Sequence, residues 1–491
     1  MANEFVNTRV PTMQFKFENS SSKSSIENWK TLIVGHSIQN TPASLNTLYL
    51  INSPEQGDYL FGAGSLTAEM IRGYKNNDSN IELWAMSIAE GNGSVAATTT
   101  ITPVISFGAD GKTPLIVSGT TSLYIGGKPV QVGISPTNSA KDISTAIAAQ
   151  INSNPYYSCI AAVSSDNNGI ITLTMTNKGT FANGTDVSFN LMGETFPIGL
   201  NFNVLDFSGG TGNPNISAVF NAIGDTRFNT FVIPFSDDLN LKLLSDELQK
   251  RWEPLVLNDG YAYTYCNKNL SESISSTNNL NSHCLTIFNT NLIPTTSFYF
   301  IAAVAAQCSA SSSIDPAMPL KDLQLIDVLP PPKFSQYKFS DRSLLLNAGI
   351  STYKCVGDSV YIERVLTTYK RNPAGISDTS LLKTEKVLTA SRARQELKSR
   401  LNLKYSRYKL APDGQNIPAG QKILTPKKAT AELISIYKDL EDEGLVTNSE
   451  EFKKNVYTSI DKKNGDQLNM NVPLYVMNQL FNANTTIQFM E

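Results

Sequence analysis

Gly62 and Gly64 are the residues that come nearest to a cofactor-binding motif. They precede a predicted helix, as the first two glycines of a dinucleotide-binding loop do. Thr67 occupies the position of the third glycine, and no acidic residue marks the end of a second strand. A plain turn from a strand into a helix explains the two glycines better, so we predict no cofactor.

Two other pairs of residues could take part in catalysis. Asp237 and Asp238 follow a predicted strand, where α/β enzymes often place carboxylates, but capping of the next helix explains both. His283 and Cys284 could form a catalytic pair, yet neighbours in a strand point to opposite faces. His36 is the other histidine of the sequence, which leaves little for acid–base or metal chemistry. We predict no catalytic residue and no metal site, with a hydrolase-type enzyme as an alternative.

The composition indicates a globular protein whose partner is not nucleic acid. The 491 residues suffice for two to four domains, and 41% of them are hydrophobic against 17% charged. A net charge of −3 argues against a protein that coats nucleic acid. Five scattered cysteines indicate a reduced compartment, and the longest apolar run, residues 298–306, is too short to span a bilayer. The N-terminus has no apolar signal core, so we expect a soluble cytoplasmic product without membrane insertion.

The elements that would position these residues follow a βαβ pattern. Short apolar runs predict strands or buried segments at residues 29–37, 47–52, 81–88, 231–235, 261–265, 284–289 and 298–306. Predicted helices follow the glycine turn and Asp237. Strands that alternate with helices predict an α/β core, which we assign to residues 26–91 and 214–330.

Residues 92–213 differ from the rest because they are rich in Thr, Ser, Gly and Asn and almost free of charge. Gly126-Gly127 predicts a hairpin turn, Ser139 can cap a helix, and residues 171–175 alternate. We predict an inserted, protruding β-rich domain of ββαββ type that leaves from a surface loop. We expect that a short linker in its place leaves a soluble, polymerising core. Glycan binding by this domain stays an alternative to an inert decoration.

Residues 344–378 are the stretch around which the second half is organised. Strand-like runs on either side of Gly357-Asp358 predict a hairpin. A basic helix over about residues 388–410 follows the hairpin. We assign residues 331–466 to a C-terminal α+β domain.

Opposite charges gather on two successive helices of this domain. The first helix has nine basic residues in and just before it, among them Arg392, Arg394, Lys398 and Arg400. The second begins at Thr425-Pro426, and its last turn carries Asp439, Glu441, Asp442 and Glu443. Carboxylates at a helix C-terminus oppose the helix dipole unless a cation meets them. We predict that the two clusters pair head to tail between copies of the chain, with solvated faces as the alternative.

Both ends of the chain carry short segments of alternating apolar residues beside polar stretches. We assign residues 1–25 to an N-terminal arm and linker and residues 467–491 to a C-terminal arm. The apolar side chains concerned are Met13, Phe15 and Phe17 in the first arm and Ile487 and Phe489 in the second. This pattern is typical of strand donation between subunits. The alternative is that each strand completes its own subunit's sheet.

A fixed order of motifs runs through the second half of the chain: NAGISTY, a Gly-Asp turn, VYIERVLTTY, an N-x-x-G-x-x-D turn, the basic helix, YSRYKLAPDG and TPKKATAEL. This order resembles that of the tail sheath proteins of contractile-tailed bacteriophages, of the Mu-like kind. The resemblance is strong over residues 315–489 and weaker over 26–90 and 215–310, and residues 92–212 carry no motif for it. Lys354-Cys355 and residues 380–382 depart from the usual pattern.

The resemblance implies a polymerising structural protein that is not an enzyme. Subunits of that family form hexameric rings stacked helically around the tail tube, and terminal arms of neighbours complete a sheet in each subunit. When the baseplate is triggered, the sheath contracts and drives the tube through the host envelope, through a change between two packings of one chain.

The implied fold is multidomain, α+β and α/β, and the implied location is the virion tail, with the host cytoplasm during assembly. The implied partners are other copies of the chain, the tail tube protein, and baseplate and tail terminator proteins. A bacteriocin-like contractile injection particle fits the same motifs. Residues 92–213 leave a glycan-binding adhesin or a baseplate component open as a further alternative.

Overall fold

The computed structural model describes residues 28–166, 169–416, 418 and 420–490. They form two compact units. The core unit consists of residues 28–389 and 478–490, and the small unit of residues 390–477. The mixture of helices and sheets predicted from the sequence is confirmed. Within the described ranges, no helix combines the length and the hydropathy that crossing a bilayer requires.

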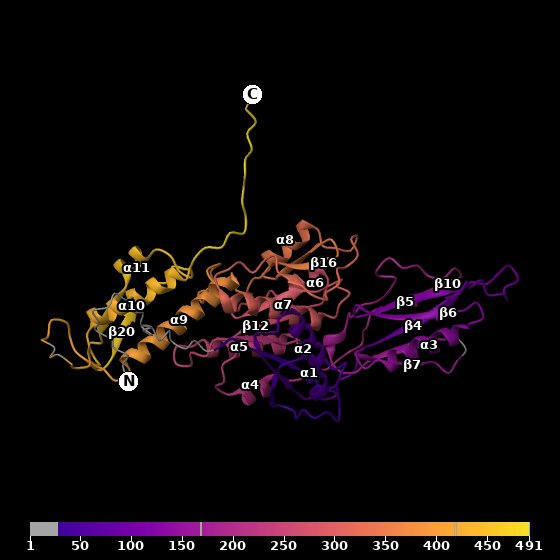
Figure 1. Ribbon diagram of the computed structural model, residues 1–491, viewed down its shortest axis with the longest axis horizontal. Coiled ribbons are helices and arrows are strands. Elements are labelled where there is room, and N and C mark those ends of the chain that lie inside the picture. The colour runs from indigo at the N-terminus through magenta and orange to yellow at the C-terminus, as the bar shows by residue number, and fades with distance from the viewer. Residues whose placement is uncertain (1–27, 167–168, 417, 419, 491) are drawn as a thin grey trace, which may run out of the picture. The chain divides into compact units, whose positions relative to one another are not determined.

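A six-stranded sheet forms the centre of the core unit (Figure 1). Its order is β13-β12-β11-β1-β3-β2, and all neighbours are parallel except the edge pair β3 and β2. The strands are β1 (Lys30–Gly35), β2 (Leu48–Ile51), β3 (Glu82–Ser87), β11 (Thr230–Val232), β12 (Tyr261–Cys266) and β13 (Leu285–Asn289). Parallel strands are usually covered on both faces, and every residue of β11, β12 and β13 is buried.

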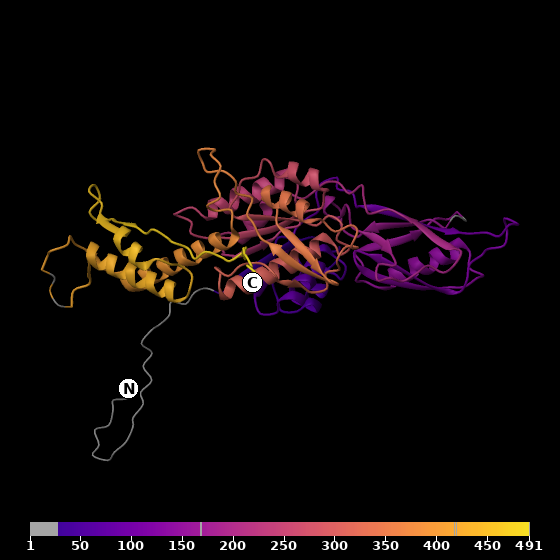
Figure 2. The same ribbon diagram turned by 90° about the horizontal axis from the view of Figure 1, so that it is seen from above.

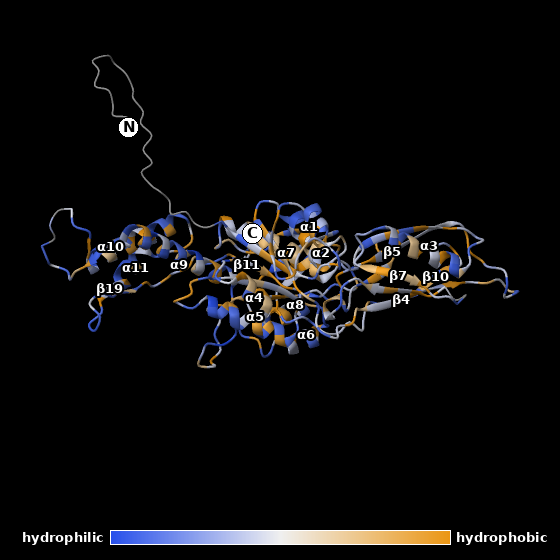
Figure 3. Cartoon of the chain, turned by 90° about the horizontal axis from the view of Figure 1, so that it is seen from below, coloured by the Kyte–Doolittle hydropathy of each residue, from blue (hydrophilic) through white to orange (hydrophobic). Residues whose placement is uncertain are grey.

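Two helices supply much of that cover. α2 (Leu66–Asn77) and α7 (Ser297–Ile314) pack against each other and against the strands. In Figure 3, α7 lies among hydrophobic, orange segments, whereas α1 (Pro54–Phe61) is largely blue. The other helices of this part are α4 (Ser217–Ile223), α5 (Asp238–Arg251) and α6 (Leu270–Ser276).

The apolar run at residues 298–306 belongs to helix α7 and is not a strand. Residues 298–306 are buried throughout, so their hydrophobicity has neither the period of a strand nor that of an amphipathic helix. Periodicity alone does not separate a buried helix from a buried strand. Length decides here, because the helix continues through small residues to Ile314.

The insert, residues 92–213, contains two sheets and one long helix. One sheet has the order β10-β4-β8-β7 and the other β6-β5-β9. Its elements are β4 (Thr98–Ile105), β5 (Gly119–Ile125), β6 (Lys128–Ile134), α3 (Ala140–Ser153), β7 (Cys159–Val163), β8 (Ile171–Met175), the 3-10 helix Thr180–Ala182, β9 (Val187–Phe189) and β10 (Leu200–Val204). The order from β5 to β8 is ββαββ, and Ser139 caps α3. Strands β4, β9 and β10 were not predicted from the sequence.

The hairpin that follows α8 (Phe339–Asn347) packs in the core unit. Its strands β15 (Thr352–Val356) and β16 (Ser359–Arg364) turn at Gly357-Asp358, as predicted, and β14 (Gln324–Leu325) adds a third strand. The Thr368 amide donates to the Leu285 carbonyl of β13 at 3.0 Å. Residues 331–389, which the sequence analysis assigns to the C-terminal domain, therefore lie with the six-stranded sheet. The domain boundaries themselves stay predictions.

The small unit is built on helices (Figure 2). α9 (Thr384–Tyr405) continues into it from residue 390, and α10 (Pro426–Asp442) starts at the predicted cap, Thr425. Tyr437 of α10 stacks on Phe452 of α11 (Ser449–Asn455), with 3.8 Å between ring centroids. Two short strand pairs complete the unit: β17 (Lys409–Leu410) with β18 (Ile423–Leu424), and β19 (Tyr457–Ile460) with β20 (Leu468–Asn471).

The insert shares buried apolar surface with the six-stranded part, which changes the expectation for its removal. The Phe181 ring of the insert lies edge-on to Phe235 and Phe298, at centroid distances of 6.4 and 5.8 Å. We predict that a chain with a Gly/Ser linker in place of residues 92–213 aggregates or loses its cooperative melting transition, because the rings of Phe235 and Phe298 lose the Phe181 ring that covers them.

Solubility and a melting curve measure this. The matched control removes only residues 108–113, a stretch of the insert that is largely exposed, and should stay soluble. A soluble core with a cooperative transition after the full deletion would contradict the prediction.

Candidate assembly surfaces

The residues that could have carried catalysis have structural partners. Asp237 is the N-cap of α5 and accepts a hydrogen bond from the Asn240 amide at 3.3 Å. Its other carboxylate oxygen accepts from the side-chain amides of Asn213, at 2.6 Å, and Asn240, at 2.8 Å. The capping role predicted for this residue is confirmed.

The glycine turn before α2 is filled by another part of the chain. Gly64 has φ +78°, and a Cβ on it would lie 2.6 Å from the carbonyl oxygens of Pro155 and Tyr157. Glycine stands there because the backbone of the insert approaches it closely. His283 faces Trp252, with 5.1 Å between ring centroids, while its neighbour Cys284 is fully buried.

Four of the five cysteines are buried, Cys355 is partly buried, and none forms a disulfide with another. Burial raises the pKa of Cys159 to about 12 and that of Cys355 to about 11, so both stay protonated at neutral pH and are poor nucleophiles. In the described ranges, no three His, Cys, Asp or Glu side chains converge on a position that could hold a metal ion.

The basic face of α9 meets the acidic face of α10 within the same chain. Arg400 Nη2 lies 2.5 Å from Asp439 Oδ2, and Arg392 Nη2 lies 3.7 Å from Glu443 Oε2. Lys404 donates to Glu432 one turn further along. The contacts advance along α9 as they retreat along α10, so the two helices run antiparallel. A cation therefore meets carboxylates in the last turn of α10, where they would otherwise oppose the helix dipole.

The other members of the two predicted charge clusters have different surroundings. Glu441 accepts a hydrogen bond from the Ser449 amide at 3.0 Å, and hydrogen bonds from the Ser449 side chain and amide lower the pKa of Glu441. Arg394 is partly buried, whereas Lys398 and Asp442 are exposed. Pairing of these clusters between copies stays a prediction, and for Arg392 and Arg400 it would have to compete with contacts inside the chain.

The pair β19 and β20 forms a sheet of only two strands in the described part of the chain. One face is held on α10, where Thr458 Oγ1 donates to the Pro426 carbonyl at 2.7 Å. Tyr457 and Met470 on the two strands are exposed. A two-stranded sheet is at best marginally stable in water, and an open edge can pair with a further strand.

The chain leaves this sheet and ends in an exposed apolar segment. Val476 bridges to Val446, and residues 478–490 then have no regular secondary structure. Ile487 and Phe489, the predicted contact residues of the C-terminal arm, are 76% and 96% exposed. Met13, Phe15 and Phe17 of the N-terminal arm lie outside the described residues.

Phe481 is a contact residue that the sequence analysis missed. Its ring lies 3.6 Å from the Arg364 guanidinium and 5.5 Å from the Lys383 ammonium, which are distances typical of cation–π contacts. The only signal in the sequence is a single aromatic residue in a polar stretch, which specifies no partner. This contact fixes the point from which the exposed residues 482–490 extend.

Two comparisons of the sequence with known proteins agree with each other, because both match tail sheath proteins. The model of the phage tail sheath protein central domain matches residues 209–368. The Mu-like prophage FluMu tail sheath protein of Haemophilus influenzae is 30% identical, over 98% of this chain and 97% of that protein.

A solved structure supports the fold. The sheath tail protein of Desulfitobacterium hafniense superposes with a TM-score of 0.52 over 96% of this chain and 97% of that chain, at 12% sequence identity. At that identity the similarity concerns the fold alone.

The ion pairs between α9 and α10 predict a stability effect in the isolated chain. Arg400→Glu places a carboxylate beside Asp439 and Glu396 and should lower the free energy of unfolding of the small unit by about 1–2 kcal/mol, since exposed pairs contribute about 0.2–1 kcal/mol each. Adding Asp439→Arg should restore part of the loss. Denaturant unfolding of the monomeric chain measures both.

Lys398→Glu is the matched control, because Lys398 is exposed on the same helix, and it should change stability by less than about 0.5 kcal/mol. If monomer stability is unchanged in the Arg400 variant while assembly fails, the charges meet between copies and the intrachain account is wrong.

Proposed function

Because the chain belongs to the phage tail sheath proteins, we propose that it is the subunit of a contractile tail sheath, which polymerises as stacked hexameric rings around a tail tube and contracts to drive that tube through the host cell envelope. The proposed location is the virion tail, after assembly in the host cytoplasm. The proposed partners are other copies of the chain, the tail tube protein, and baseplate and tail terminator proteins.

The observation that carries the proposal is an incomplete sheet and an exposed apolar end in the same chain. Among the described residues, no third strand pairs with β19 or β20, and residues 482–490 have no regular secondary structure and are exposed, Ile487 and Phe489 among them. In the arrangement we propose, terminal arms of neighbouring copies add strands to this pair. Backbone hydrogen bonds then supply affinity, and alternate side chains bury their apolar face.

A comparison of burial and association free energies explains why such arms suit a polymer. Full burial of Ile487 and of Phe489 contributes about 1.5–3 kcal/mol each, whereas association costs about 4–15 kcal/mol in lost translational and rotational freedom. One arm therefore holds a free subunit weakly. In a lattice the N-terminal arm, with Met13, Phe15 and Phe17, holds the same subunit a second time, and the linked contacts act together.

The same arrangement fits contraction. The work comes from the difference between two packings of one chain, so the step requires neither bond cleavage nor a cofactor. Arms that pair by strand addition keep neighbours joined while other contacts between copies break and re-form. The sheath of a bacteriocin-like injection particle operates on the same physics, so the proposal covers it as an alternative particle.

The arms generate a direct prediction. Removing residues 482–491 should leave a chain that folds and melts as the full chain does but stays monomeric or forms only short rings, because residues 482–490 are exposed and belong to no helix or strand of their own subunit. Removing residues 1–18 should have the same effect, and mixing the two truncated chains should not restore long polymers. Sedimentation and a melting curve measure both properties.

A matched pair of variants separates side chains from length. Ile487→Ser with Phe489→Ser removes the apolar face of an alternating strand, whereas Thr486→Ala with Gln488→Ala changes the opposite face. Only the first pair should block polymerisation. Polymers of normal length from the truncated chain, or a clear drop in its melting temperature, would refute strand donation.

A further inference from the structure

The insert contacts the rest of the core unit through a cluster of charges around one buried carboxylate. Glu69 of α2 is 1% exposed, and its Oε2 lies 2.7 Å from Arg72 Nη1 of the same helix and 2.6 Å from Lys128 Nζ of the insert. Lys128 also donates to the Tyr156 carbonyl at 2.7 Å. Arg72 continues the cluster to Asp58 at 2.5 Å and lies over the Tyr156 ring.

Shape complementarity accompanies these charges. The hairpin turn Gly126-Gly127 of the insert lies on Thr295 and Thr296, just before α7. A Cβ on Gly126 would lie 2.4 Å from Thr296 Cγ2, and one on Gly127 would lie 3.2 Å from Thr295 Cα. Both glycines have positive φ, as the turn requires. The turn therefore fits against α7 only because neither residue has a side chain.

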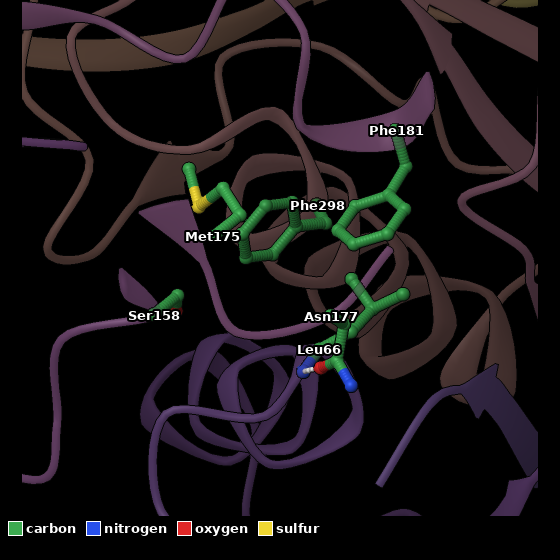
Figure 4. Close-up of a pocket in the computed structure, with 6 residues that line it drawn as sticks. All are labelled: Leu66, Ser158, Met175, Asn177, Phe181 and Phe298. Atoms are coloured by element: carbon green, nitrogen blue, oxygen red, sulfur yellow. Dashed lines mark hydrogen bonds between the residues drawn. The ribbon is translucent and has the colours of Figure 1, made fainter. Parts of the chain in front are cut away.

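The insert also forms hydrogen bonds with the core unit through Asn177 and an apolar contact through Phe181. Asn177 of the insert accepts from the Leu66 amide at 2.9 Å and donates to the Ser37 carbonyl at 3.0 Å. Figure 4 shows Asn177 beside Leu66, and the Phe181 ring beside that of Phe298. The cavity that Leu66, Asn177, Phe181 and Phe298 line together with Ser158 and Met175 is about 10 Å³, about what one water molecule needs.

The chain crossing into the insert takes part as well. Glu90, where the chain enters the insert, accepts from the Lys178 amide at 2.9 Å. From the six-stranded sheet, Tyr265 of β12 donates its hydroxyl to the Phe181 carbonyl at 2.9 Å. The insert is thus held by ionic, polar and apolar contacts. We call the core residues that make these contacts the seat: Ser37, Leu66, Glu69, Arg72, Phe235, Tyr265, Thr295, Thr296 and Phe298.

We propose that the seat fixes the insert in one orientation on the core unit, and that Lys128 is the positioning residue on which this fixed orientation depends. Glu69 is buried, so Lys128 supplies one of the two cations that compensate its charge, and it does so from the insert side. Breaking one partner of a buried ionic contact leaves a charge under-compensated in a medium of low polarity. Since Lys128 is the first residue of β6 and its side chain is 28% exposed, its loss should loosen the seat without unfolding the insert or the sheet.

The inference goes beyond the proposed function and does not depend on it. A fixed insert moves with the six-stranded sheet as one body, so every copy in an assembly presents the outer surface of its insert in the same direction. A hinged insert would sample many directions and could not form a regular surface.

Cleavage of the full-length chain by a glutamyl endopeptidase tests the proposal, because Glu90 lies in a chain crossing and is bonded to the insert. Lys128→Met should raise the rate of cleavage after Glu90 at least tenfold, as followed by mass spectrometry of the fragment that ends there. Cleavage after Glu247 in α5 should not change. Lys128→Arg should behave as the unmodified chain, and Lys112→Met, which alters an exposed lysine of the insert, is the matched control.

A second variant keeps the test decisive if Lys128→Met does not fold. Tyr265→Phe removes one hydrogen bond across the seat at nearly constant volume and should raise cleavage after Glu90 at least threefold. The proposal is overturned if cleavage after Glu90 is unchanged in the variants that fold. It is also overturned if cleavage after Glu247 rises equally, since the substitutions then destabilise the whole unit.

Discussion

Open strand edges constrain how this chain can exist as a stable protein. In the described part of the chain the β19–β20 pair has no third strand, and pairs of this size have little stability of their own. The hydrogen bond from Thr458 to the Pro426 carbonyl holds the pair on α10. An edge without a partner can pair with a further strand. Residues 482–490 are exposed and have no regular secondary structure, so under the proposed strand donation they are the segment available for such pairing.

Two pairs of the oppositely charged residues on α9 and α10 already meet inside one chain, and pairing between copies stays a prediction. Arg400 and Asp439, like Arg392 and Glu443, meet inside one chain and stabilise the packing of α9 on α10. Contacts of this kind lie inside one chain and need no neighbouring copy. If the chain assembles as proposed, backbone pairing and apolar burial at the arms are the interactions that depend on assembly, and the ion pairs between α9 and α10 stabilise the subunit independently of them.

Patterns among residues adjacent in the sequence were sufficient to predict several turns and helix caps of the fold. The Gly357-Asp358 turn and the caps at Ser139, Asp237 and Thr425 were predicted where the structure has them, because each depends on residues adjacent in the sequence. Helix α7 was ambiguous, since a segment buried on all sides shows no periodicity.

Contacts between segments far apart in the chain could not be predicted from such local patterns. The close approach of Gly64 to Pro155 and the bond between Glu69 and Lys128 join residues far apart in the chain, and single glycines or charges do not name their partners. For α9 and α10, the pattern of charges gave the correct signs. Sequence does not distinguish a partner in the same chain from one in a neighbouring copy.

The central claim is that strands from neighbouring copies complete the β19–β20 pair. Electron cryomicroscopy of the assembled polymer tests it most directly, by tracing the backbone on both sides of that pair. The account predicts a larger sheet in which the added strands belong to other subunits, with Ile487 and Phe489 of one of them buried against the sheet. A sheet that stays two-stranded in the polymer, or is completed by the terminal segments of its own chain, would contradict it.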